Sequence, residues 1–130
     1  MAVFTQELTQ KETDTDEVTK PVLTDIRTVW RKVRRGIRSI LLEHSQLTFI
    51  PEDVYAACVS GQALLWTTSE GFVITTSEID TFTDERTFLL WLAYAYDGIG
   101  GKLVVKHQKF FDDTAREAGY AKIETRSPVP

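Results

Sequence analysis

The chain has 130 residues, of which 42% are hydrophobic and 11% aromatic. This length is enough for one domain with a substantial core and too short for two. The formal net charge of −4 argues against a general nucleic-acid binder, because such proteins neutralise phosphates with clustered Lys and Arg.

The sequence predicts neither targeting nor membrane insertion nor a metal centre. MAVFTQELTQKETDTDEV has no basic start followed by an apolar stretch, so we expect no signal peptide and an origin in the cytoplasm. No apolar run reaches the roughly 18 residues of a membrane span. Cys58 is the single cysteine and there are two histidines, His44 and His107, so an internal disulfide is excluded and structural zinc is not expected.

Residues 1–20 form a polar segment rich in Thr, Gln, Glu and Asp. They show no helical or strand periodicity, so alone they should be a mobile tail that becomes ordered against a partner. A single domain is expected over residues 21–130.

A long helix is predicted from the cap candidates Thr24 and Asp25 to about Leu42. Its apolar stripe consists of Ile26, Val29, Trp30, Val33, Ile37 and Ile40. We interpret the cluster RKVRR at 31–35, with the flanking Arg27 and Arg38, as the solvated side of this helix. A basic face for nucleic acid or an acidic partner is the alternative.

A short second helix and three strands are predicted next. Pro51 suits the first turn of a helix, and Gly61 is a plausible stop. The strands are QALLWT (62–67), GFVITTSE (71–78) and TFLLWLAY (87–94), joined by connections that suit antiparallel hairpins. The third is apolar at nearly every position, so both its faces should be covered, and we expect it at the centre of the sheet.

The glycine-rich turn DGIGG leads into a predicted helix from Lys102 to Ala118. A last strand, YAKIET (120–125), would lie parallel to the strand before the turn. The pattern therefore predicts an α+β fold with a mixed sheet.

The turn is a candidate phosphate-binding site. Gly98, Gly100 and Gly101 would let the backbone approach a pyrophosphate, and Lys102 adds a positive charge. A simple tight turn is the alternative, which Asp97 favours because its charge opposes a phosphate.

The remaining candidates have weaker signals. General-base catalysis would require a carboxylate or histidine near an amine, and the candidates are Glu70, Glu78, Asp80 and His107, all with structural interpretations as alternatives. Tyr94 and Tyr96 are expected in packing or at a cleft, and Cys58 as a small buried hydrophobe.

The order of these elements resembles the GNAT acetyltransferase superfamily. The segments VWRKVRRGIRSIL, IPEDVYAACVSGQALLW, GFVI, DTFTDERTFLLWLAYA and AREAGYAKIE, with the terminal SP, resemble more closely the small GNAT-like proteins of tailed bacteriophages, over residues 22–128. The resemblance implies two N-terminal helices, antiparallel strands, a central strand, the glycine turn, a crossover helix and a parallel strand. In the superfamily this turn holds the pyrophosphate of acetyl-CoA.

Two departures from the superfamily pattern shape the functional prediction. Gly98-Ile99-Gly100 matches the second half of the turn motif, but Ala95 occupies the position of its Gln or Arg. The chain stops at Pro130 without the further helix that often supplies the acid, so the domain is expected to be a C-terminally truncated GNAT-like domain.

These departures favour a non-catalytic structural component of a tailed-phage virion, in the portal, tail or collar region. Such a chain would be made in the host cytoplasm, be present in several copies and bind other virion proteins through residues 1–20. It would need no cofactor, membrane or nucleic acid. One alternative is an acetyl-CoA-dependent N-acetyltransferase acting on a host or phage amine. Another is a small regulatory protein that uses the basic helix.

Overall fold

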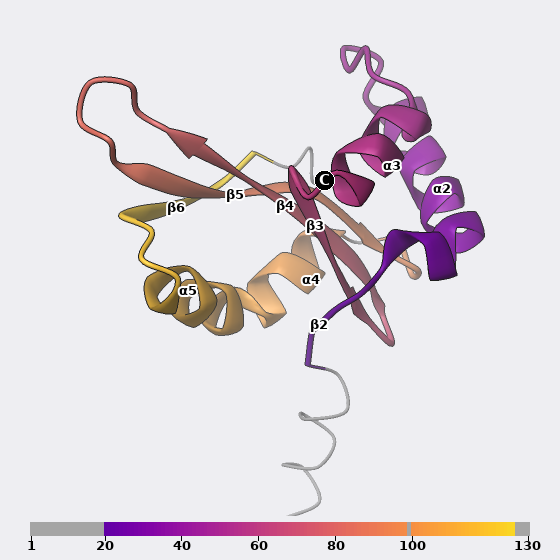
Figure 1. Cartoon of the computed structure of the whole chain (residues 1–130). Helices are drawn as coiled ribbons and strands as arrows, with labels where there is room; N and C mark the ends of the chain where they lie inside the picture. The colour runs from indigo at the N-terminus through magenta and orange to yellow at the C-terminus, as the bar shows by residue number, and fades with distance from the viewer. Residues whose placement is uncertain (1–19, 99, 127–130) are drawn as a thin grey trace, which may run out of the picture.

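The computed structural model describes residues 20–98 and 100–126, which form a five-stranded sheet between two helical layers (Figure 1). The strand order is β2-β3-β4-β5-β6, and only β5 and β6 are parallel. The strands are β2 (Val22–Leu23), β3 (Ala63–Thr68), β4 (Gly71–Ile79), β5 (Arg86–Ala95) and β6 (Lys122–Thr125). This mixed sheet confirms the predicted fold class.

The first layer consists of α2 (Ile26–Glu43) and α3 (Pro51–Val59). Asp25 caps α2, since its carboxylate accepts a hydrogen bond of 3.0 Å from the backbone N–H of Arg27. Pro51 opens α3, and Asp53 accepts a hydrogen bond of 3.0 Å from the N–H of Ile50. Both predicted helices are confirmed.

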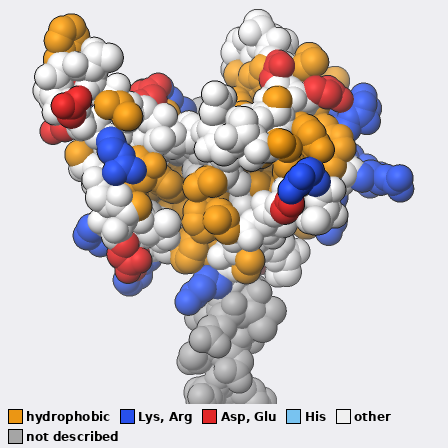
Figure 2. All heavy atoms as spheres, in the orientation of Figure 1, with side chains coloured by type: hydrophobic (Ala, Val, Ile, Leu, Met, Phe, Trp, Pro, Cys, Tyr) orange, Lys and Arg blue, Asp and Glu red, His pale blue; other side chains and the backbone are white. Residues whose placement is uncertain are grey.

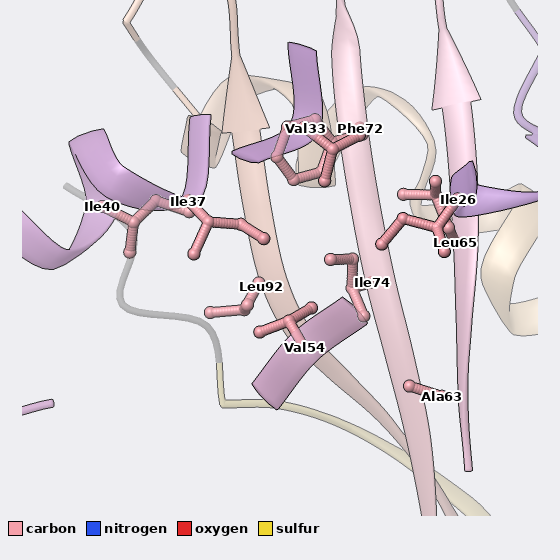
Figure 3. Close-up of a cluster of buried hydrophobic side chains, with 10 residues drawn as sticks. All are labelled: Ile26, Val33, Ile37, Ile40, Val54, Ala63, Leu65, Phe72, Ile74 and Leu92. Atoms are coloured by element: carbon pink, nitrogen blue, oxygen red, sulfur yellow. The ribbon is translucent and has the colours of Figure 1, made fainter. Parts of the chain in front are cut away.

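The apolar stripe of α2 packs on the sheet together with α3 (Figure 3). The buried residues of this cluster are Ile26, Val33, Ile37, Ile40, Val54, Ala63, Leu65, Phe72, Ile74 and Leu92. Gly36 faces the same cluster, and a Cβ there would lie 2.6 Å from the Phe72 ring and 2.8 Å from the Tyr94 ring. Glycine therefore lets α2 approach the sheet closely.

The second layer consists of α4 (Gly100–Lys106) and α5 (Gln108–Glu117). Their buried side chains meet those of the opposite sheet face in a second cluster: Trp66, Val73, Phe88, Leu90, Ala93, Ala95, Leu103, Val104, Phe111 and Ala115. Within it the indole N–H of Trp66 donates a hydrogen bond of 3.0 Å to the Thr75 hydroxyl. Each face of the sheet thus has its own core.

Two expectations about the fold were wrong. The helix expected over 102–118 is interrupted at His107, whose φ of −106° and ψ of 17° are not helical. The apolar side continues across the interruption, so periodicity could not reveal it. The middle strand is β4 rather than β5, because the two-residue strand β2 adds an edge that is too short to produce alternation. No described helix is long and apolar enough to cross a membrane.

Candidate functional site

The strand β5 is divided by an irregularity at Trp91. Its pairing with β4 passes from Ile74↔Leu92 to Thr75↔Leu90, so Trp91 has no partner across the ladder. A bulge of this kind bends the strand and redirects a side chain. Trp91 accordingly packs against the same core cluster as its neighbour Leu92, with its ring 5.4 Å from that of Phe49.

Beyond the bulge, β5 has no second neighbour among the described residues. Its last pair with β6 is Leu90↔Thr125, and Arg126 N–H then donates a hydrogen bond of 2.9 Å to the Leu90 carbonyl. β5 nevertheless continues to Ala95. The edge of Trp91–Ala95 that faces away from β4 is therefore available for backbone hydrogen bonds to a ligand.

The glycine turn begins where this edge ends. Tyr96 N–H donates a hydrogen bond of 2.9 Å to the Glu70 carbonyl, and Gly98 N–H one of 2.8 Å to the Ala95 carbonyl. Gly98 has a φ of +89°, which favours glycine, and a Cβ built there would meet no atom within 4 Å. The space above the turn is thus open.

A groove of about 250 Å³ beside the turn carries mixed charge, and its lining residues are Glu70, Ala95, Asp97, Lys102, Leu103 and Lys106. Lys106 forms an ion pair of 2.9 Å with Glu70. Lys102 is exposed and forms no ion pair with another described residue. Glu70, a candidate base in the sequence, is therefore occupied by a lysine. Lys102 is available to an anion, although Asp97 reduces the positive charge around it.

A hollow of about 470 Å³ lies on the opposite face of the sheet, where α3 leaves the strands uncovered. Figure 2 shows it between one flank formed by the β4–β5 hairpin and another formed by α2 and α3. Its lining residues are Ala57, Gln62, Thr76, Glu78, Leu89, Trp91 and Arg126. Trp91 thus connects this hollow to the unpaired edge of β5.

The guanidinium of Arg126, which lines this hollow, is shared by two carboxylates, of which Glu78 lines it as well. Arg126 forms ion pairs of 2.8 Å with Glu78 and 3.1 Å with Glu124. Hydrogen bonding to these carboxylates, above all Glu78, raises the pKa of Arg126 further above its ordinary value. The structure therefore brings Glu78, but not Asp80, to the hollow. Asp80 accepts backbone hydrogen bonds from Phe82 and Thr83 in the hairpin turn, and these lower its pKa.

Tyr94 and Tyr96 both lie toward the α2 side of the sheet. The Tyr94 ring packs 5.7 Å from the Phe72 ring, whereas Tyr96 is 40% exposed beyond it. Tyr94 therefore serves packing, and Tyr96 reaches the surface near the glycine turn.

His107 and Cys58 lie away from the unpaired edge. His107 is buried, and its Nε2 has no hydrogen-bond partner among the residues that the structure describes. Burial, reinforced by Lys106 and opposed by Glu70, lowers its pKa below 6.5. Cys58 is half-buried, and burial raises its pKa to about 11. In residues 20–98 and 100–126, no group of three or more His, Cys, Asp or Glu side chains is placed to hold a metal ion.

Sequence comparisons find no relative, whereas comparison of structures does. No family model matches the chain, and no curated protein does. The structure is similar to that of a ribosomal-protein-alanine N-acetyltransferase from Brucella melitensis biovar Abortus 2308, with a TM-score of 0.62 and 15% identity over 84% of this chain and 80% of that one.

Two further acetyltransferases have a similar structure. One is described as a probable acetyltransferase, with a TM-score of 0.58 and 13% identity over 82% of this chain and 77% of that one. The other is an aminoglycoside acetyltransferase from an uncultured soil metagenomic sample, in complex with sisomicin, with a TM-score of 0.52 and 11% identity over 85% and 78% of the two chains. The chain therefore has a GNAT-like fold, as the sequence resemblance implied.

The functional preference drawn from the sequence was wrong. A non-catalytic virion component was expected, but the structural neighbours are acetyltransferases, and nothing in the comparisons supports a virion role. The location and the partners expected through residues 1–20 stay untested, and residues 1–19 lie outside the described part of the chain.

Proposed function

We propose that the chain is an acetyl-CoA-dependent N-acetyltransferase. The observation that carries this proposal is the unpaired edge of Trp91–Ala95, which runs from the hollow at Trp91 to the glycine turn. An elongated ligand held along that edge can have an anionic end at the turn and a reactive end at the hollow. The GNAT-like fold supports the same assignment.

The residues at the turn fit the anionic end of acetyl-CoA. A Cβ at Gly98 would meet no atom within 4 Å, residues 100 and 101 are also glycine, and Lys102 has no competing ion pair among the described residues. The methyl group of Ala95 is buried in the core under α4, so this position offers no side-chain hydrogen bond. Binding therefore depends on backbone groups and Lys102.

The hollow fits an amine acceptor. When bound, acetyl-CoA supplies an activated thioester, whose carbonyl carbon forms a bond with the amine nitrogen while the bond to sulfur breaks. Trp91 and Leu89 provide an apolar floor, and Glu78 on β4 is the carboxylate that lines the hollow, where Arg126 holds it in an ion pair of 2.8 Å. None of the described residues is assigned the role of the acid that protonates the departing thiolate.

The experiment is calorimetric titration of the full chain with acetyl-CoA, followed by acetyl transfer from labelled acetyl-CoA to a panel of primary amines. Binding should be measurable below millimolar concentration. Lys102→Glu should weaken it by about tenfold or more, because it replaces an attraction to phosphate with a repulsion. Arg38→Glu makes the same charge change on α2 and serves as the control. Absence of binding at millimolar acetyl-CoA would refute the proposal.

We also infer that the chain originates from a bacteriophage. It is supported only by the resemblance of the two N-terminal segments, VWRKVRRGIRSIL and IPEDVYAACVSGQALLW, to small phage-encoded GNAT-like proteins. The genomic neighbourhood provides the test, since a coding sequence outside phage or prophage DNA would contradict it.

A further inference from the structure

Lys32 on α2 lies beside the glycine turn, on the face of the sheet opposite to α4. Its Nζ is 4.8 Å from the centre of the Tyr96 ring. Tyr96 lies between Ala95 and Asp97, and both of these residues line the groove beside the turn. In Figure 1, α2 and α4 lie on opposite sides of the sheet. The turn therefore has a lysine from each helical layer near it.

The position of Tyr96 depends on its backbone and on one neighbouring ring. Its backbone N–H is bonded to the Glu70 carbonyl at 2.9 Å, and its ring lies 6.1 Å from that of Tyr94. Tyr94 is in turn packed against Phe72 beneath Gly36. The face of an aromatic ring attracts a cation placed over it. Lys32 is thus held near the turn, and no carboxylate in the described ranges forms an ion pair with it.

The charges near the turn leave a surplus of positive charge. Lys106 and Glu70 cancel each other in their ion pair of 2.9 Å. Neither Lys32 nor Lys102 forms an ion pair with a residue in the described ranges. Asp97 contributes one negative charge against these two, so the surroundings favour an anion.

We propose that Lys32 is a second phosphate-binding residue for the nucleotide end of coenzyme A, acting from the α2 side while Lys102 acts from the α4 side. This inference rests on the proposed function. The chemical basis of the proposal is the charge of the nucleotide end, which carries several phosphate charges. A single lysine together with the backbone of the turn cannot neutralise all of them. Tyr96 serves as the platform that positions the Lys32 ammonium group.

The test is calorimetric titration of the full chain with coenzyme A at low salt. Lys32→Ala should raise the dissociation constant about five- to tenfold, and Lys32→Arg should restore most of the affinity. Tyr96→Leu keeps the lysine and removes its platform, so it should give a smaller increase. Arg38→Ala is the matched control, since Arg38 is exposed on the same helix about 9 Å further along its axis.

The outcomes separate this inference from the proposed function. If the unaltered chain binds coenzyme A and Lys32→Ala binds it equally well, the inference fails and the function stands. Equal weakening by Lys32→Ala and Arg38→Ala would also overturn it, because the effect would then come from the general field of α2. If the unaltered chain does not bind, the proposed function itself fails. Circular dichroism of each variant checks that it is folded.

Discussion

The two halves of β5 both contribute side chains to the core but have different neighbours. Residues 87–90 pair with β4 on one side and β6 on the other, so their backbone groups are committed to the sheet. Residues 91–95 pair with β4 and have no other partner among the described residues. The comparison shows that the end of β6 and the bulge at Trp91, rather than side-chain chemistry, separate a structural half of the strand from a ligand-accessible one.

The largest expected effect concerns the structural half. Leu90 is fully buried between β5 and the second helical layer, so Leu90→Ala should lower the free energy of unfolding by about 2–5 kcal/mol. Urea unfolding followed by tryptophan fluorescence measures it. Val105→Ala, at an exposed position of α4, is the control. A loss as small as that of the control would show that this half is not tightly packed.

A smaller loss is expected where α2 supports the accessible half. Gly36→Ala would place a methyl group within 3 Å of Phe72 and Tyr94, so overpacking should lower the free energy of unfolding by about 1–3 kcal/mol. Because Tyr94 is displaced, coenzyme A should also bind more weakly.

The sign of the change in the free energy of unfolding tests whether α2 lies as close to the sheet as described. In a helix without such contacts, replacing glycine with alanine stabilises by about 1 kcal/mol. An increase in the urea midpoint of Gly36→Ala would therefore contradict the close approach of α2 to β5.

A pH-dependent effect is expected at the break between α4 and α5. Burial lowers the pKa of His107 below 6.5, so the unfolded chain takes up its proton before the folded chain does. This contribution to stability is complete above about pH 6.5 and is lost as the pH falls below it. His107→Leu should reduce the difference in urea midpoint between about pH 7 and about pH 5. If His107→Leu left the difference in urea midpoint between the two pH values unchanged, His107 would not be the source of the pH dependence. His44→Leu is the control.

The smallest effect on stability is expected at the hollow. Arg126 is exposed at the protein surface, and its ion pairs with Glu78 and Glu124 are screened by water, so Arg126→Ala should leave the urea midpoint unchanged within error. The same variant frees both carboxylates and should alter the Michaelis constant for a cationic amine. A change in stability without a change in that constant would assign Arg126 to the sheet rather than to the hollow.

Much of the fold was predictable because it depends on local patterns. Asp25 and Pro51 begin helices for reasons contained in their own chemistry, and two short strand-like runs joined by a tight turn were sufficient to place β3 and β4. The break at His107 was not predictable, since Leu103 and Phe111 continue the same apolar side across it. The glycines and Lys102 were recognisable as candidates, whereas nothing in the sequence indicated that Lys32 lies over Tyr96.

The sequence by itself determined most of the helices and strands, that one turn is rich in glycine, and that the resemblance is to a GNAT-like fold. Only the tertiary structure decided that β6 leaves β5 at Leu90, that Trp91 is directed to the hollow and that Glu78 faces the same space. The physical reason is that pairing register and the approach of distant segments depend on how complete layers pack together. Local sequence patterns therefore do not reveal how those distant segments pack.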